Sequence, residues 1–83
     1  MEMSRNSDIN VAGNSYHIQT EDWGLDSPFI VSRVYKNGAV VKSVKTPYTE
    51  LISAPLWDRT AVENAVEKQH NQILDLVTSG QRL

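Results

Sequence analysis

Residues 29–46 have the sequence Phe-Ile-Val-Ser-Arg-Val-Tyr-Lys-Asn-Gly-Ala-Val-Val-Lys-Ser-Val-Lys-Thr. Two runs rich in β-branched and aromatic residues, which favour strands, flank the dipeptide Asn37-Gly38. Asn-Gly supplies the two positive-φ positions of a type I′ turn, whose twist matches that of paired antiparallel strands. The segment therefore predicts a β-hairpin with strands at residues 29–36 and 39–46.

Upstream of the hairpin, residues 9–11 and 16–21 alternate apolar and polar side chains around the turn-forming residues 12–15. Such alternation predicts two further strands. Downstream, Thr46-Pro47 ends the hairpin because proline removes a backbone donor. We expect an antiparallel meander of three to four strands within residues 8–46. Residues 1–7 and 81–83 are expected to be tails of one domain that spans residues 8–80.

Residues 58–79 change to the period of a helix. Asp58 can serve as the N-cap, with Trp57 and Val62 positioned for a hydrophobic staple, while Thr60 with Glu63 offers a competing capping box two residues later. Gly80 stands where a left-handed C-terminal cap is expected. One stripe of the helix holds Val62, Ala65, Val66, Gln69, Ile73, Leu76 and Val77. The predicted fold is α+β, with the meander packed on one face by a single C-terminal helix (ββββα).

The two-residue turn also predicts the pairing within the hairpin, because it places Lys36 opposite Ala39. Counting outward pairs Val34 with Val41 and Arg33 with Lys42. Like charges that face each other would be costly if buried, so we expect the helix to cover the other, serine-bearing face. The face left open is predicted to be an interaction surface formed by Phe29, Val31, Arg33, Tyr35, Val40, Lys42 and Val44.

Composition limits the functional classes. The 83 residues include no cysteine, which excludes disulfides and thiolate metal sites, and no apolar run has the length needed to cross a bilayer. The N-terminus lacks the apolar core of a signal peptide, so we expect a cytoplasmic protein. The net charge of −2 argues against a general nucleic-acid binder, although the hairpin carries Arg33, Lys36, Lys42 and Lys45 without any acidic residue.

Metal and catalytic sites are not predicted. His17 and Glu21 share a strand face but lie roughly 13 Å apart along an extended chain, which is too far for a common ion. His70, on the helix, could join them only across the fold. The chain has no G-x-S-x-G, H-E-x-x-H or glycine-rich phosphate-binding motif. We therefore expect neither an enzyme nor a bound cofactor or metal ion.

The heptapeptide Tyr16-His-Ile-Gln-Thr-Glu-Asp22 resembles a small bacterial domain family of unassigned function, often seen with a Tyr/Phe-His-Val/Ile-Gln-Thr-Glu-Asp motif. In that family the motif is followed by a hairpin, a Lys/Arg-Thr-x-Tyr segment and a helix with a Gln-His pair. Residues 45–48 and 69–70 match those two features. The resemblance brings no activity or ligand, but it marks His17, Gln19, Thr20, Glu21 and Asp22 as a possible motif. Between a functional role and hydrogen bonds that join the second strand to the helix or the next loop, we prefer the hydrogen bonds.

The open sheet face therefore predicts a non-enzymatic protein-interaction or self-association module, with a protein partner or a homodimer. The alternative is binding of nucleic acid or an acidic partner through the basic hairpin 29–46, in which cations beside Tyr35 and Phe29 could hold phosphates and stacked bases.

Overall fold

The predicted hairpin is present. The computed structural model describes residues 3–24, 26–51 and 58–80, and in it β3 (Phe29–Lys36) and β4 (Ala39–Pro47) are antiparallel neighbours. Asn37 and Gly38 have φ angles of 54° and 80°, as a type I′ turn requires. The hairpin and its turn are thus confirmed, and β4 runs one residue further than predicted, to Pro47.

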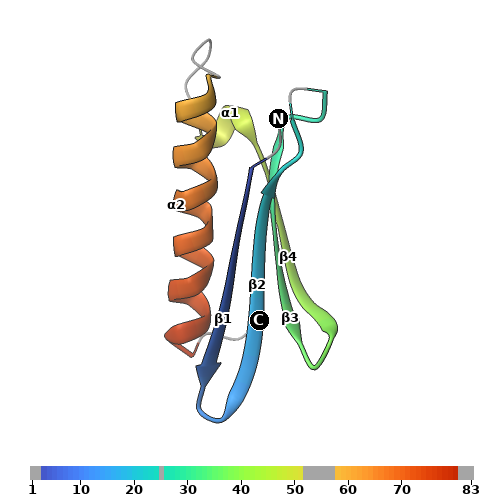
Figure 1. Ribbon diagram of the computed structural model, residues 1–83, viewed down its shortest axis with the longest axis vertical. Helices are drawn as coiled ribbons and strands as arrows, with labels where there is room; N and C mark the ends of the chain where they lie inside the picture. Colours follow the sequence, from blue (N-terminus) through green and yellow to red (C-terminus); the bar gives the residue numbers. More distant parts are fainter. Residues whose placement is uncertain (1–2, 25, 52–57, 81–83) are drawn as a thin grey trace.

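Two strands precede the hairpin, β1 (Ser4–Val11) and β2 (Asn14–Asp22), and the sheet order is β1-β2-β3-β4 (Figure 1). The predicted ββββα fold is therefore correct. The expectation of a tail over residues 1–7 is wrong for Ser4–Ser7, which pair with β2 from Glu21 to Ile18. Their polar composition hid the strand, because an edge strand needs backbone partners more than it needs apolar side chains.

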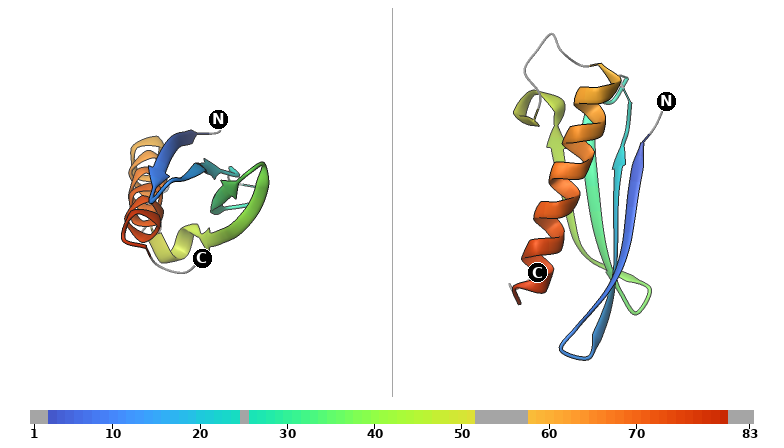
Figure 2. Two further views of the ribbon diagram at one scale, coloured as in Figure 1. Left: turned by 90° about the horizontal axis from the view of Figure 1, so that it is seen from below. Right: turned by 60° about the vertical axis from the view of Figure 1, so that its left-hand side comes forward.

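The C-terminal helix α2 (Arg59–Thr78) runs lengthwise over one face of the sheet, and the short helix α1 (Tyr48–Leu51) lies on the same side (Figures 1 and 2). Asp58 accepts a hydrogen bond from Ala61 N–H at 2.8 Å, which confirms it as the N-cap. Gly80 has a φ of 76° and its N–H donates to the carbonyl of Val77, as a left-handed cap requires. The predicted staple at Trp57 lies outside the described residues.

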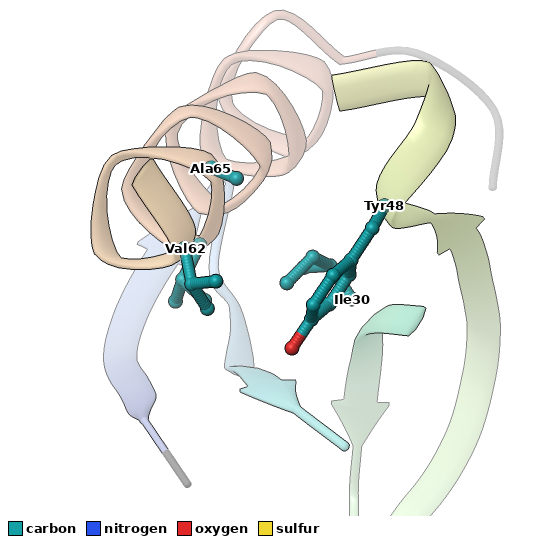
Figure 3. Packing of buried hydrophobic residues seen from close by; sticks show 5 residues of the cluster. Ile30, Tyr48, Val62 and Ala65 are labelled. Atoms are coloured by element: carbon teal, nitrogen blue, oxygen red, sulfur yellow. The ribbon is translucent and has the colours of Figure 1, made fainter. Parts of the chain in front are cut away.

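The core between the sheet and the helices has two parts. Near the N-terminus of α2, Tyr48 and Ile30 pack against Val62, Ala65 and Val66 (Figure 3). Near its C-terminus, Ile18 and Val34 pack against Ile73 and Val77. Between the two parts the buried side chains are polar: Thr20, Ser32, Gln69 and His70. The helix therefore covers the face that carries Ile30, Ser32 and Val34, as the sequence predicts.

The pairing of β3 with β4 departs from the predicted register at a β-bulge. Tyr35 pairs with Val40 as expected, but Val34 pairs with Lys42, so that Val41 is an extra residue in β4. Arg33 then lies opposite Ser43 and not opposite Lys42. The bulge separates the two cations that a regular ladder would place side by side.

Candidate interaction surface

The face of the sheet opposite α2 is not covered by any helix in the described part of the chain (Figure 2). Because side chains alternate along a strand, the registers assign its residues. We call it the open face, and it includes Asn6 and Asp8 from β1, His17, Gln19 and Glu21 from β2, Phe29, Val31, Arg33 and Tyr35 from β3, and Val40, Ser43 and Lys45 from β4.

Five of the seven residues predicted for the interaction surface lie on the open face: Phe29, Val31, Arg33, Tyr35 and Val40. Lys42 and Val44 do not, and this part of the prediction is wrong. The bulge at Val41 shifts the rest of β4 by one residue, and a shift of one residue moves every later side chain to the other face. Val44 consequently packs beside the core cluster that contains Ile18 and Val34.

Glu21 is the centre of a polar cluster on the open face. Its Oε1 accepts hydrogen bonds from the Arg33 guanidinium at 3.1 Å and from the Trp23 indole N–H at 3.0 Å, and Gln19 Nε2 lies 3.4 Å from Oε2. The Glu21 and Arg33 side chains are each about one-third exposed, at 30% and 33%. The open face therefore holds its most central charges as a pair, and Trp23 is fixed beside them.

Aromatic rings and cations meet at the end of the open face near the β2–β3 loop. Lys45 Nζ lies 4.2 Å from the centre of the Phe29 ring and 4.9 Å from that of Trp23. The Arg33 guanidinium carbon is 6.0 Å from the Trp23 ring centre. Such distances permit cation–π attraction. Trp23, which follows β2, thus contributes to this surface.

The other end of the open face, near the two hairpin turns, is formed by His17, Asp8 and Tyr35. Nδ1 of His17 lies 2.9 Å from a carboxylate oxygen of Asp8, and its ring centre is 5.9 Å from that of Tyr35. A groove of about 540 Å³ lies over these residues. In the described part of the chain neither His17 nor Asp8 hydrogen-bonds to a hydroxyl side chain.

The heptapeptide 16–22 is divided between the two faces of the sheet. His17, Gln19 and Glu21 lie on the open face, whereas Thr20 and Asp22 are buried on the helix side, where they are 0% and 3% exposed. The preferred reading, hydrogen bonds to the helix and the next loop, describes the two buried residues: Thr20 Oγ1 is 2.8 Å from His70 Nδ1, and Asp22 accepts from Gly24 N–H at 2.8 Å.

Asp22 also joins the β2–β3 loop to α1, because its carboxylate accepts a hydrogen bond from the Tyr48 hydroxyl. Burial, together with the Asp22 hydrogen bond and charge, raises the pKa of Tyr48 well above its usual range. Tyr48 therefore stays protonated and remains a donor to Asp22 at neutral pH. From the sequence, Tyr48 was marked only as the last residue of the segment 45–48 that matches the family resemblance, with no partner predicted for it.

His17 and His70 do not come together in a shared site. His17 lies on the open face, while His70 lies in the core on the other side of β2, bonded to Ser7 and Thr20. No group of three or more His, Cys, Asp or Glu side chains suitable for a metal ion occurs among residues 3–24, 26–51 and 58–80. Sequence reasoning missed Asp8, Trp23 and Ser7 as partners in these clusters, because each bond joins residues whose proximity depends on the register or the fold.

Comparisons with known proteins return no match: no protein-family model, no curated protein and no solved structure is similar to this chain. None of the helices in the described part of the chain is both long and apolar enough to cross a membrane. The family resemblance of residues 16–22 accordingly stays a prediction.

Proposed function

We propose that the protein is a non-enzymatic interaction module whose open face associates with another protein molecule, with a second copy of the chain as the first partner to test. The observation that carries the proposal is that the described helices both lie on one side of the sheet, so that the aromatic side chains of the open face have no covering element. A cysteine-free chain of this kind is suited to the reducing cytoplasm, which we propose as its site of action.

The apolar part of the open face is concentrated at the β3–β4 hairpin. Val40 is 50% exposed and the bulge residue Val41 is 42% exposed, and Tyr35 lies opposite Val40 in the register. Val31 is 4% exposed although it lies on the open face, so it adds little to the surface. The apolar region proposed to make the contact is therefore Tyr35 and Val40 with the adjoining bulge residue Val41, and Phe29 lies at the other end of β3.

The charges on the open face favour a second copy. Asp8 and Glu21 are balanced there by Arg33 and Lys45, so two copies can meet without net repulsion. Cations next to acids on the same surface also allow cross-pairing between copies, which sets the orientation more than the affinity.

Sedimentation equilibrium tests the proposal with a matched pair of variants. The weight-average mass of the wild type should rise above the 9.3 kDa of one chain as concentration increases. Tyr35→Glu should weaken this association, because it places a charge in the apolar part of the interface. The control Gln72→Glu adds the same charge at an exposed position of α2 and should leave the association unchanged. A mass that Tyr35→Glu does not affect would contradict the proposal.

A second candidate function is binding of single-stranded nucleic acid, and the cluster of Lys45 and Arg33 beside Trp23 and Phe29 favours it. It is weakened because Arg33 is paired with Glu21 and because Lys36 and Lys42 belong to the helix side. Fluorescence anisotropy with mixed oligonucleotides over a salt series tests it, since phosphate contacts give a steep dependence on salt. Oligonucleotide binding by the wild type that is lost in Lys45→Ala would support this function, and an absence of binding at low salt would contradict it.

A further inference from the structure

The two edges of the sheet differ in how well they are protected against pairing with another strand. β4 carries Lys42 and Lys45, ends at Pro47 and contains the bulge at Val41. Lysine, proline and bulges are the devices by which edge strands avoid further pairing. β1, with the sequence Ser-Arg-Asn-Ser-Asp-Ile-Asn-Val over eight residues, carries the charges of Arg5 and Asp8 but has neither lysine nor proline, and its pairing with β2 is regular. β1 is therefore the edge open to an added strand.

The backbone of β1 presents its free hydrogen-bonding groups at alternate residues. Asp22 N–H donates to the carbonyl of Met3, and the regular register then turns the polar groups of the odd-numbered residues toward β2. The groups of the even-numbered residues consequently point outward, and these residues are Ser4, Asn6, Asp8 and Asn10. All four are exposed.

From these observations we infer that β1 pairs antiparallel with β1 of a second copy, with Ser7 facing Ser7 of the partner on the two-fold axis. This arrangement joins the two sheets into one and keeps both copies of α2 on the same face. The inference goes beyond the proposed function, since it concerns a different surface: the edge of the sheet and not its open face.

The register follows from counting bonds and charges. With Ser7 on the axis, every outward residue meets an outward residue, Asn6 facing Asp8 and Ser4 facing Asn10, so that four residue pairs can exchange backbone hydrogen bonds. A shift that puts Asp8 opposite Asp8 leaves only three such pairs and places two carboxylates together. The opposite shift, with Asn6 opposite Asn6, also leaves three within β1. The Ser7-centred register is the one that satisfies the most groups.

Side chains agree with that register. On the open face the Asn6 amide can donate to the Asp8 carboxylate of the other copy, which already accepts from His17. On the helix side Arg5, whose guanidinium is 3.9 Å from Glu67, lies opposite Ile9 and not opposite a second arginine. Because α2 packs mainly on β2, the two helices would be about three strand spacings, or ~14 Å, apart, which is wider than the contact distance of packed helices. The spacing of the two α2 helices therefore permits the pairing.

Sedimentation equilibrium with Asn6→Pro tests the edge. Proline at this position leaves the bonds to β2 intact, because the Asn6 N–H points outward, but it removes two symmetry-related bonds of the dimer. The dimer dissociation constant should rise about tenfold or more. Asn6→Ala retains the N–H and is the matched control, and circular dichroism establishes that both variants are folded. In chains that carry Tyr35→Glu, in which association through the open face is weakened, the edge dimer should persist and should still respond to Asn6→Pro, which separates the edge from the open face.

Cysteine crosslinking tests the register in a chain that has no other cysteine. Ser7 of each copy would form a non-hydrogen-bonded pair with Cα atoms ~4.5 Å apart, within disulfide range, so Ser7→Cys should form a covalent dimer under mild oxidation. The control Asn10→Cys lies six residues off the matching position, ~20 Å from its copy, and should crosslink much more slowly. A monomer at high concentration would overturn the inference and leave the edge to a strand of another protein. Equal crosslinking of the two variants, or a dimer indifferent to Asn6→Pro, would also overturn it.

Discussion

Nδ1 of His70 lies 2.8 Å from Oγ1 of Thr20, and this bond joins the middle of α2 to the middle of the sheet. The other ring nitrogen lies 2.8 Å from the hydroxyl of Ser7. Thr20 Oγ1 is also 2.7 Å from Ser32 Oγ, which accepts from the Gln69 amide at 3.0 Å. A continuous line of hydrogen bonds thus crosses the interface between β1, β2, β3 and the helix.

The direction of these hydrogen bonds depends on the charge of His70. In the neutral tautomer with its proton on Nε2, Gln69 donates to Ser32, Ser32 to Thr20, and Thr20 to Nδ1, while Nε2–H donates to Ser7; this tautomer gives every hydroxyl along the line a partner. A proton on Nδ1 makes Thr20 the acceptor. Ser32 then receives two bonds, and its own proton has no acceptor among the described residues.

Stability should therefore fall in mild acid. Burial, followed by the positive charges of Arg5 and His17, lowers the pKa of His70 below the 6.5 of the unfolded chain. Between the pKa of His70 in the folded protein and that in the unfolded chain, the unfolded state binds more protons. The contribution of neutral His70 to the free energy of unfolding is therefore complete above pH 6.5 and decreases as the pH drops below it. Arg5 is itself paired with Glu67, and His17 with Asp8.

Denaturant unfolding followed by circular dichroism from pH 8 to pH 5 measures this dependence. His70→Gln, which cannot take up a proton, should be less stable at pH 8 than the wild type but should lose less stability on acidification. If the free energy of unfolding falls equally with pH in the two proteins, a group other than His70 governs the loss of stability in acid.

Thr20→Val tests the hydrogen-bond line by removing one hydroxyl at nearly constant volume. Because Thr20 is fully buried, the change removes the partner of His70 Nδ1 and one of the two partners of the Ser32 hydroxyl in the core, and we expect a loss of about 1–3 kcal/mol. Thr46→Val on β4 is the control, since no side-chain hydrogen bond joins Thr46 to the described residues. A double variant with Ser32→Ala should lose less than the sum of the two single losses, because both act on one line.

The sequence predicted the parts of the fold that depend on neighbours along the chain. The Asn37-Gly38 turn, the Asp58 cap and the Gly80 cap each need only local geometry, and all three are where they were expected. The face that the helix covers was also predicted correctly, although the prediction placed Arg33 opposite Lys42, a pairing that the bulge removes. Local chemistry thus determines the elements of this chain, while the register across β3 and β4 needs more.

Contacts between segments far apart in the chain could not be predicted from the sequence. The bond between Thr20 and His70 joins residues 50 positions apart, and nothing local to either residue indicates it. The bulge was not predicted for a different reason: Val40-Val41 contains no glycine or proline, and either valine suits a regular strand. Missing that one residue was enough to assign Lys42 and Val44 to the wrong face.

The turn between β1 and β2 contains a strained residue, Ala12, and a substitution there should relieve the strain. Ala12 has a φ of 52°, in the left-handed region that costs a residue with a Cβ atom about 1–2 kcal/mol. Asparagine adopts this region more readily, as Asn37 does at the equivalent position of the second hairpin, with a φ of 54°. Ala12→Asn should therefore stabilise the protein by about 0.5–1 kcal/mol in thermal or denaturant unfolding. The same exchange at the strand residue Ala39 should give no gain, and a gain at both sites would point to a cause other than the turn.

From the position of the bulge we predict that two single-residue deletions in β4 differ in their effect on stability. Removing Val41 takes out the extra residue, so Val40 stays opposite Tyr35 and Lys42 stays opposite Val34, now in a regular ladder. Both core and open face keep their side chains, and we expect the free energy of unfolding to change by no more than about 1 kcal/mol, since Val41 is 42% exposed.

Removing Val44 should cost much more, although it also shortens β4 by one valine. If the bulge persists, Lys45 moves to the helix side opposite Ser32. If the bulge disappears, Lys42 moves opposite Arg33 on the open face, which is the like-charge pairing that the native register avoids. Either outcome also removes a side chain that packs on the core, so we expect a loss of about 2–3 kcal/mol. Equal stabilities of the two deletion variants in urea would mean that the position of the bulge does not determine which side chains β4 presents to each face.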